Sequence, residues 1–128
     1  MVVVTLGTDC SGVGMANLAL RGLGVRVRHV FASEVCPLAR ATLAANAPAE
    51  TTYADIRDRS LVAPPVVDLY IVGFPCQPFS LAGLRHGFAA AGGNGLVFFN
   101  VHAYISRARS KAFVLENLAG LLSTSEGT

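Results

Sequence analysis

The sequence predicts an α/β fold with a mostly parallel, doubly wound sheet. Three observations support this fold: β-branched runs alternate with helically spaced segments, glycine or proline marks the joints, and polar residues follow the ends of the apolar runs. A length of 128 residues suits one small domain, and 52% apolar against 14% charged residues excludes a disordered chain. The formal charge of +2 is too small to predict nucleic-acid binding from electrostatics alone.

The apolar pattern places eight elements along the chain. Strands are expected at residues 2–6, 27–33, 53–56, 66–72 and 112–115, and helices at 15–23, 37–46 and 96 to about 109. Residues 73–95 are rich in glycine and proline, which predicts a long loop of the kind that is usually functional or mobile. The chain stops soon after its last strand and leaves that strand as an edge, so we expect a C-terminally truncated fold.

The three cysteines are odd in number and widely spaced, at Cys10, Cys36 and Cys76. This spacing favours neither a disulfide framework nor a metal site, and it indicates a reducing, intracellular compartment. The first residues lack the features of a signal peptide, and no apolar run approaches the ~18 residues of a membrane span. We therefore expect a protein without a metal ion and without a membrane partner.

A candidate cofactor site lies at the ends of the first three strands. Gly7, Gly12 and Gly14 fall in the first strand-to-helix turn, where glycine lets a ligand approach the backbone. Glu34 follows the second strand, 20 positions after Gly14, and Asp55 ends the third. A plain tight turn and surface carboxylates explain each feature singly. Together they favour a nucleoside cofactor, since ligands of such sheets bind at the carboxyl ends of strands.

A second constellation pairs Cys76, in the stretch GFPCQPFS, with Glu116, in AFVLENLAG. Each follows a predicted strand, so neighbouring strands would bring both to one cleft. Taken alone, the cysteine is more simply a packing residue and the carboxylate a turn cap. A thiolate that adds to C6 of cytosine makes C5 nucleophilic towards a sulfonium methyl group, and the ring then needs an acid at N3. A glutamate that keeps or shares a proton in a partly dry pocket meets that need.

The order of motifs resembles the cytosine-C5 DNA methyltransferase family almost end to end. The matching stretches are LGTDCSGVGMANLAL, FASEVCPLARATLAAN, YADIRD, DLYIVGFPCQPFSLAGLRHG, GNGLVFF and FVLENLAGLLS. GFPCQPFS followed at the right interval by LENL is highly specific. The resemblance implies a Rossmann-like methyltransferase fold that uses S-adenosylmethionine, and a DNA substrate whose target cytosine is flipped out of the helix.

The resemblance also implies two sets of site residues. The catalytic set is Pro75, Cys76, Gln77, Glu116 and Asn117. The cofactor set is Asp9, Cys10, Gly12, Gly14, Glu34, Val35, Asp55, Ile56 and Gly73. Cys76 would add to C6, Glu116 would engage N3 and the exocyclic amino group, and Asn117 would hold the Pro-Cys segment. Glu34 would bind the ribose, and Asp55 with Ile56 the adenine.

The match also has departures. Cys10 stands where the family usually has phenylalanine, and we expect Asp9 beside it to approach the cofactor's ammonium group. The family's later motifs and its target-recognition region are absent from residues 1–128, so this partial catalytic domain should bind cofactor weakly and methylate little by itself. Three alternatives stay open: a transfer-RNA cytosine-C5 methyltransferase, a non-catalytic or split fragment that needs a second polypeptide, and a dinucleotide oxidoreductase.

Overall fold

A five-stranded sheet forms the centre of the computed structural model, which describes residues 2–76 and 96–123. Its strands are β1 (Val4–Asp9), β2 (Val27–Ser33), β3 (Thr51–Tyr53), β4 (Leu69–Gly73) and β5 (Ala112–Glu116). They lie in the order β3-β2-β1-β4-β5, and each neighbouring pair is parallel. The doubly wound parallel sheet predicted from the sequence is thereby confirmed.

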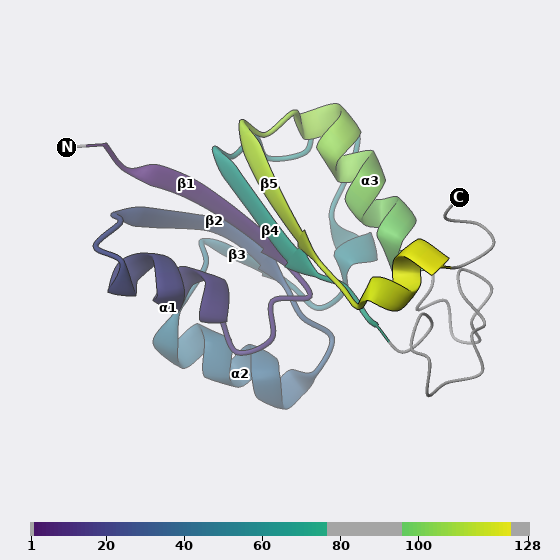
Figure 1. Ribbon diagram of the computed structural model, residues 1–128. Helices are drawn as coiled ribbons and strands as arrows, with labels where there is room; N and C mark the ends of the chain where they lie inside the picture. The colour runs from purple at the N-terminus through teal and green to yellow at the C-terminus, as the bar shows by residue number, and fades with distance from the viewer. Residues whose placement is uncertain (1, 77–95, 124–128) are drawn as a thin grey trace.

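Helices cover both faces of this sheet. Figure 1 shows α1 (Met15–Gly22) and α2 (Pro37–Asn46) on one side and α3 (Val97–Ala108) on the other. Two short 3-10 helices, η1 (Ile56–Asp58) and η5 (Ala119–Ser123), follow β3 and β5. The strand order reverses between β1 and β4, and the carboxyl ends at such a switch point are where open α/β sheets bind ligands.

An aromatic core lies between the sheet and α3. Phe31 of β2, Tyr70 of β4 and Tyr104 of α3 are fully buried, with the Tyr70 and Tyr104 ring centres 4.5 Å apart and the Phe31 and Tyr104 centres 5.3 Å apart. Such ring pairs add to the free energy gained by burying their apolar area. This core fixes α3 against the face of the sheet formed by β2 and β4.

The sequence predicts some boundaries correctly and others not. The strand expected at 27–33 and the proline-started helix at 37–46 have the expected bounds. The first strand runs on to Asp9, because Thr8 and Asp9 still pair with Ile71 and Val72 of β4. The third ends at Tyr53, because Asp55 caps η1. The fourth begins at Leu69 rather than at residue 66.

Candidate functional site at the carboxyl ends of the strands

The turn after β1 contains backbone conformations that most residues avoid. Cys10, Gly12 and Gly14 have φ of +50°, +55° and +91°. A Cβ at Gly12 would meet no atom within 4 Å, so this position faces open space. A Cβ at Gly14 would lie 2.7 Å from the Cβ of Ala47, so Gly14 packs against the end of α2. Of these two predicted cofactor glycines, Gly12 leaves room for a ligand, whereas Gly14 allows the turn to lie against α2.

Glu34, directly after β2, is tied to this turn. Its Oε2 accepts a hydrogen bond from the Gly12 N–H at 2.7 Å, and its Oε1 accepts one from the Cys36 N–H at 2.8 Å. The carboxylate therefore lies beside the open position at Gly12, where the sequence predicted a cofactor contact. Val35, the next predicted cofactor residue, is 65% exposed.

Asp55 begins the short helix that follows β3. Its Oδ1 accepts from the Arg57 N–H, while Asp58 accepts from the Asp55 N–H, which completes a capping box. The Arg57 guanidinium also pairs with Asp55, at 2.6 Å, and this hydrogen bond lowers the pKa of the Asp55 carboxyl. Arg57 is two-thirds exposed and is free to move to solvent, and Ile56 is buried beneath the turn.

Cys10 marks the place where the three strand ends meet. Its pKa is raised to about 12, first by burial and then by the negative charges of Asp9, Glu34 and Asp55. The charges act on one thiol because the residues that follow β1, β2 and β3 converge around it. The structure thus brings together the predicted cofactor residues of all three strands, and it keeps Cys10 a neutral thiol.

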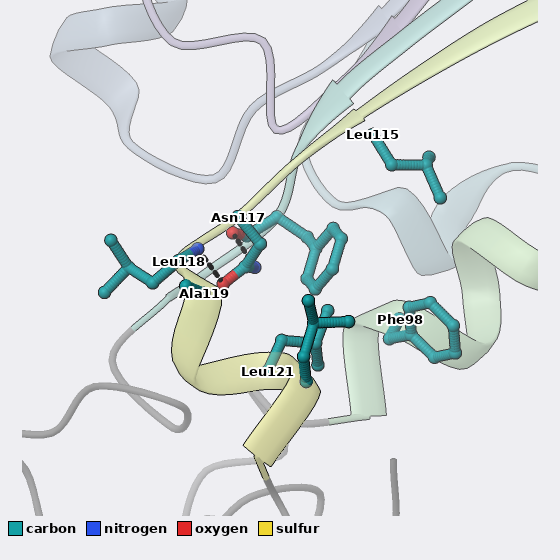
Figure 2. A pocket seen from close by; sticks show the side chains of 8 residues that line it. Phe98, Leu115, Asn117, Leu118, Ala119 and Leu121 are labelled. Atoms are coloured by element: carbon teal, nitrogen blue, oxygen red, sulfur yellow. Dashed lines mark hydrogen bonds between the residues drawn. The ribbon is translucent and has the colours of Figure 1, made fainter. Parts of the chain in front are cut away.

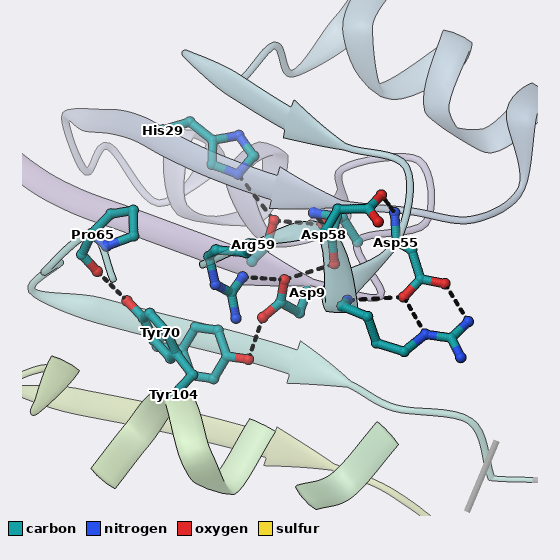
Figure 3. A network of polar contacts seen from close by, with 12 residues as sticks. Asp9, His29, Asp55, Asp58, Arg59, Pro65, Tyr70 and Tyr104 are labelled. Carbon is teal, nitrogen blue, oxygen red and sulfur yellow. Dashed lines mark hydrogen bonds and ion pairs between the residues drawn. The ribbon is translucent and has the colours of Figure 1, made fainter. Parts of the chain in front are cut away.

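The Asp9 carboxylate lies among core side chains. Its side chain is fully buried, and its carboxylate accepts hydrogen bonds from the Ser33 hydroxyl at 2.6 Å, the Tyr70 hydroxyl at 2.5 Å and Arg59 Nη1 at 2.6 Å. Figure 3 shows this carboxylate turned towards Arg59 and Tyr70. Core donors therefore hold both oxygens of the Asp9 carboxylate, and its contact with a cofactor ammonium group stays a prediction.

Sequence reasoning missed the partners of Asp9. Arg59 is 3% exposed, and its guanidinium carbon lies 4.6 Å from the Phe31 ring centre and 4.5 Å from that of Tyr104. Its hydrogen bond and ion pair with Asp9 raise the pKa of Arg59 against the opposing effect of burial. No local pattern indicated this pair, because the residues on either side of Arg59, Asp58 and Ser60, are polar and exposed.

The second predicted constellation lies at the ends of β4 and β5. These strands are parallel neighbours, and Gly73 is the register partner of Glu116. A Cβ on Gly73 would lie 3.1 Å from Glu116 Oε2, so the absence of a side chain there gives the carboxyl its place. Pro75 and Cys76 follow three residues or fewer after Gly73 and are half-buried. Gln77 lies outside the described residues.

Two further observations describe this end of the sheet. Glu116 is exposed, so within the described residues it does not lie in the partly dry pocket that the sequence argument expected. Asn117 Nδ2 donates to the Phe74 carbonyl at 3.0 Å, and the Leu118 N–H donates to Asn117 Oδ1 at 2.8 Å (Figure 2). The first bond supports the expected role of Asn117, because it holds the residue directly before Pro75.

An apolar pocket adjoins Asn117. Its lining comes from α3, from the residue after β4, and from the end of β5 to η5; it consists of Phe74, Phe98, Leu115, Asn117, Leu118, Ala119, Leu121 and Leu122. Every residue of β5 is exposed. Among the described residues, the last residues of β4 and β5 are therefore more exposed than the last residues of β1 and β2.

Two further kinds of feature, metal-ligand clusters and membrane-spanning helices, are absent from the described residues. Residues 2–76 and 96–123 contain no group of three or more His, Cys, Asp or Glu side chains that could hold a metal ion. The helices within the same ranges are too short or too polar to cross a membrane.

Comparison with known proteins gives a consistent result. A family model described as C-5 cytosine-specific DNA methylase matches residues 9–128. Type II methyltransferase M.NlaX of Neisseria lactamica is 37% identical over 117 residues, which are 91% of this chain and 37% of that protein. Type II methyltransferase M.HaeII of Haemophilus aegyptius is also 37% identical, over 91% of this chain and 35% of that protein.

Solved structures support the fold. The Dnmt2 methyltransferase of S. pombe superposes with a TM-score of 0.71 at 16% identity, over 98% of this chain and 38% of that one. A putative DNA modification methyltransferase encoded within an E. coli prophage gives 0.70 at 21% identity, over 96% and 34%. The chain spans roughly a third of the length of these proteins and of the two methyltransferases above.

Proposed function

Because this chain belongs to the C-5 cytosine-specific DNA methylase family, we propose that it carries the cofactor site and the nucleophile of a DNA cytosine-C5 methyltransferase. The observation that carries the proposal is the register of β4 and β5. It sets Glu116 beside Gly73, three positions before Cys76, so an acid and a thiol share one end of the sheet. The domain is then a partial one, since the matched relatives are about three times as long.

The residues at the first three strand ends fit S-adenosylmethionine. Gly12 offers open space and a backbone N–H, and Glu34 places two acceptor oxygens beside it for ribose hydroxyls. Asp55 and Ile56 would hold the adenine, with Arg57 leaving Asp55 for solvent. The two carboxylates, Glu34 and Asp55, also suit a molecule with a sulfonium and an ammonium group. When bound, this cofactor supplies an electrophilic methyl group.

Cys76 and Glu116 would act on the cytosine ring. The Cys76 thiolate attacks C6 and forms an S–C6 bond, and the electron pair of the C5–C6 double bond moves to C5. Glu116 donates a hydrogen bond or a proton at N3, which stabilises the charge that the ring accepts. C5 would then bond to the methyl group as the bond from that group to the sulfonium breaks and leaves its electron pair on sulfur. Loss of the C5 proton to solvent and departure of the Cys76 thiolate would then restore the C5–C6 double bond. Because Glu116 is exposed here, a flipped base and the polypeptide around it would have to supply the dry environment.

A second candidate is a split enzyme in which another polypeptide completes the domain. The exposure of all five β5 residues favours it, because a parallel edge strand with exposed Phe113, Val114 and Leu115 offers both backbone groups and apolar surface to a partner. The transfer-RNA alternative has no such observation in its favour. Whether the rest of the domain belongs to the same polypeptide or to a second one, we expect residues 1–128 alone to transfer methyl groups slowly.

Labelled methyl transfer to duplex DNA, with the chain in excess over DNA, tests the proposal. Cys76→Ser should lower the rate by roughly 10³-fold or more, because the hydroxyl is a far weaker nucleophile. Cys36→Ser is the matched control and should leave the rate unchanged, since the Cys36 thiol is free and exposed and only its backbone N–H, which serine keeps, contacts Glu34. Equal rates for Cys76→Ser and the unmodified chain would refute the mechanism. Transfer to transfer RNA but not to duplex DNA would favour the alternative substrate.

A further inference from the structure

One buried carboxylate contacts all of the segments that would hold the cofactor. Asp9 ends β1 and directly precedes Cys10 and the glycine turn. Ser33, which donates to Asp9 Oδ1, ends β2 and directly precedes Glu34. Arg59, which pairs with the same oxygen, directly follows η1 and so ends the segment that begins at Asp55. Figure 3 shows Arg59 beside the Asp9 carboxylate.

The Asp9–Arg59 ion pair is buried, and its hydrogen bond fixes the orientation of the guanidinium. The Asp9 and Arg59 side chains are 0% and 1% exposed, and the guanidinium lies against both the Phe31 and the Tyr104 ring. Arg59 Nε and Nη2 have no hydrogen-bond partner in the described structure, so Asp9 alone satisfies this guanidinium with a carboxylate. A buried ion pair is no better for stability than well-packed apolar residues, but it holds its two segments in one relative position.

We propose that the Asp9–Arg59 ion pair, together with Ser33, positions the three cofactor-binding segments relative to one another. These are positioning residues, because none of the three reaches the open space at Gly12. The inference rests on the proposed function, since it assigns the pair a role in binding S-adenosylmethionine. In the chain without cofactor, we expect the turn at Gly12 and the η1 segment to lose order together when the ion pair is removed.

A double replacement separates positioning from packing. Asp9→Leu with Arg59→Leu removes both buried charges together and leaves an apolar core, so cooperative unfolding should persist. Without cofactor, hydrogen exchange at the Gly12, Arg57 and Asp58 amides should accelerate at least tenfold. These amides report on the segments, because they donate to Glu34 Oε2, Asp55 Oδ1 and the Asp55 carbonyl. The dissociation constant for S-adenosylmethionine should rise about tenfold.

The exposed Arg28–Glu50 pair gives the matched control. It also joins β2 to the segment before β3, but its side chains are 60% and 48% exposed. Arg28→Gln with Glu50→Gln should change neither the three exchange rates nor the dissociation constant by more than twofold. Unchanged exchange and unchanged affinity in the Asp9/Arg59 variant would overturn the inference.

Two single variants keep the test decisive if the double variant does not fold. Ser33→Ala removes the donor next to Glu34 and should accelerate Gly12 exchange about threefold or more. Tyr70→Phe removes the third hydrogen-bond donor to Asp9. Because Tyr70 lies in β4 and not in one of the three cofactor segments, this change should alter the exchange rate of the Gly12 amide by less than twofold. Equal effects of the two would overturn the inference. If the unmodified chain binds no S-adenosylmethionine, the proposed function fails for this chain, and the exchange rates, measured without cofactor, still decide the positioning role.

Discussion

The cofactor side and the nucleophile side of the site are built in opposite ways. At the ends of β1, β2 and β3, carboxylates accept hydrogen bonds from backbone amides or buried side chains, and the segments are joined through Asp9. At the ends of β4 and β5, Glu116 is exposed and each residue of β5 is exposed with it. We therefore expect substitutions in the first region to change stability, and substitutions in the second to change the proposed chemistry with little effect on stability.

The largest expected contrast comes from Glu116→Gln. The amide keeps the size of the carboxyl but cannot donate a proton, so methyl transfer should fall by about 10²- to 10⁴-fold. Because Glu116 is exposed, the free energy of unfolding should change by less than about 0.5 kcal/mol. Urea denaturation and single-turnover methyl transfer measure the two quantities. Glu50→Gln, on the exposed Arg28 pair, is the control that should keep the methyl-transfer rate.

The opposite result on stability would break the comparison. A loss of several kcal/mol in Glu116→Gln would mean that the nucleophile side is as tightly coupled to folding as the cofactor side.

Next in size is the effect of Gly14→Ala on the cofactor side. The new Cβ would approach Ala47 Cβ to 2.7 Å at a φ of +91°, so we expect a loss of about 3 kcal/mol in the free energy of unfolding. Gly12→Ala meets no atom within 4 Å at a φ of +55° and should cost only about 1 kcal/mol. Denaturation of both variants gives the difference. A Gly12 variant as unstable as the Gly14 variant would contradict the open position at Gly12.

The glycine pair also shows what the sequence can predict. Gly12 and Gly14 lie in one turn, and the sequence predicts the same role for both. The contact between Gly14 and Ala47 that distinguishes them forms only when α2 packs against the turn, so the local sequence does not reveal it. In contrast, the strand at 27–33 and the helix at 37–46 follow from local patterns, β-branched residues and a proline at the first turn. Local pattern was sufficient for these two elements.

Asp9 and Arg59 mark the limit of local pattern. They lie 50 positions apart, and nothing near either residue indicates burial against the other. From sequence, Asp9 is a carboxylate near a predicted cofactor turn, and only the continued pairing of β1 with β4 turns it into the core. The register that sets Gly73 beside Glu116 is a similar long-range fact, although the sequence did predict that the two strands are neighbours.

Gly73→Ala should produce a moderate effect on the nucleophile side. The added Cβ would lie 3.1 Å from Glu116 Oε2, so the carboxyl must shift by a few tenths of an ångström. We expect the rate of methyl transfer to fall by about tenfold, because small displacements of reacting groups are costly, with stability within about 1 kcal/mol. Saturating cofactor separates this effect from weaker binding. A normal rate at saturation would show that Gly73 serves the cofactor rather than Glu116.

The smallest expected effect is a pH dependence from the cofactor side. His29 is 5% exposed beneath the glycine turn, where its Nε2 lies 3.0 Å from Thr8 Oγ1 and its Nδ1 3.1 Å from the Ala47 carbonyl. Burial lowers the pKa of His29 below its ordinary 6.5. The unfolded chain therefore binds a proton that the folded chain does not, and stability falls as pH drops below about 6.5.

The loss should be on the order of 1 kcal/mol for each unit by which folding lowers this pKa. His29→Gln should flatten the dependence between pH 7 and pH 5, since the carboxyl groups with lowered pKa, such as Asp55, act mainly below that range. Urea denaturation at a series of pH values measures it. An unchanged slope in His29→Gln would assign the dependence to other groups. An effect of the same size in His102→Gln, an exposed histidine of α3, would show that burial is not its cause.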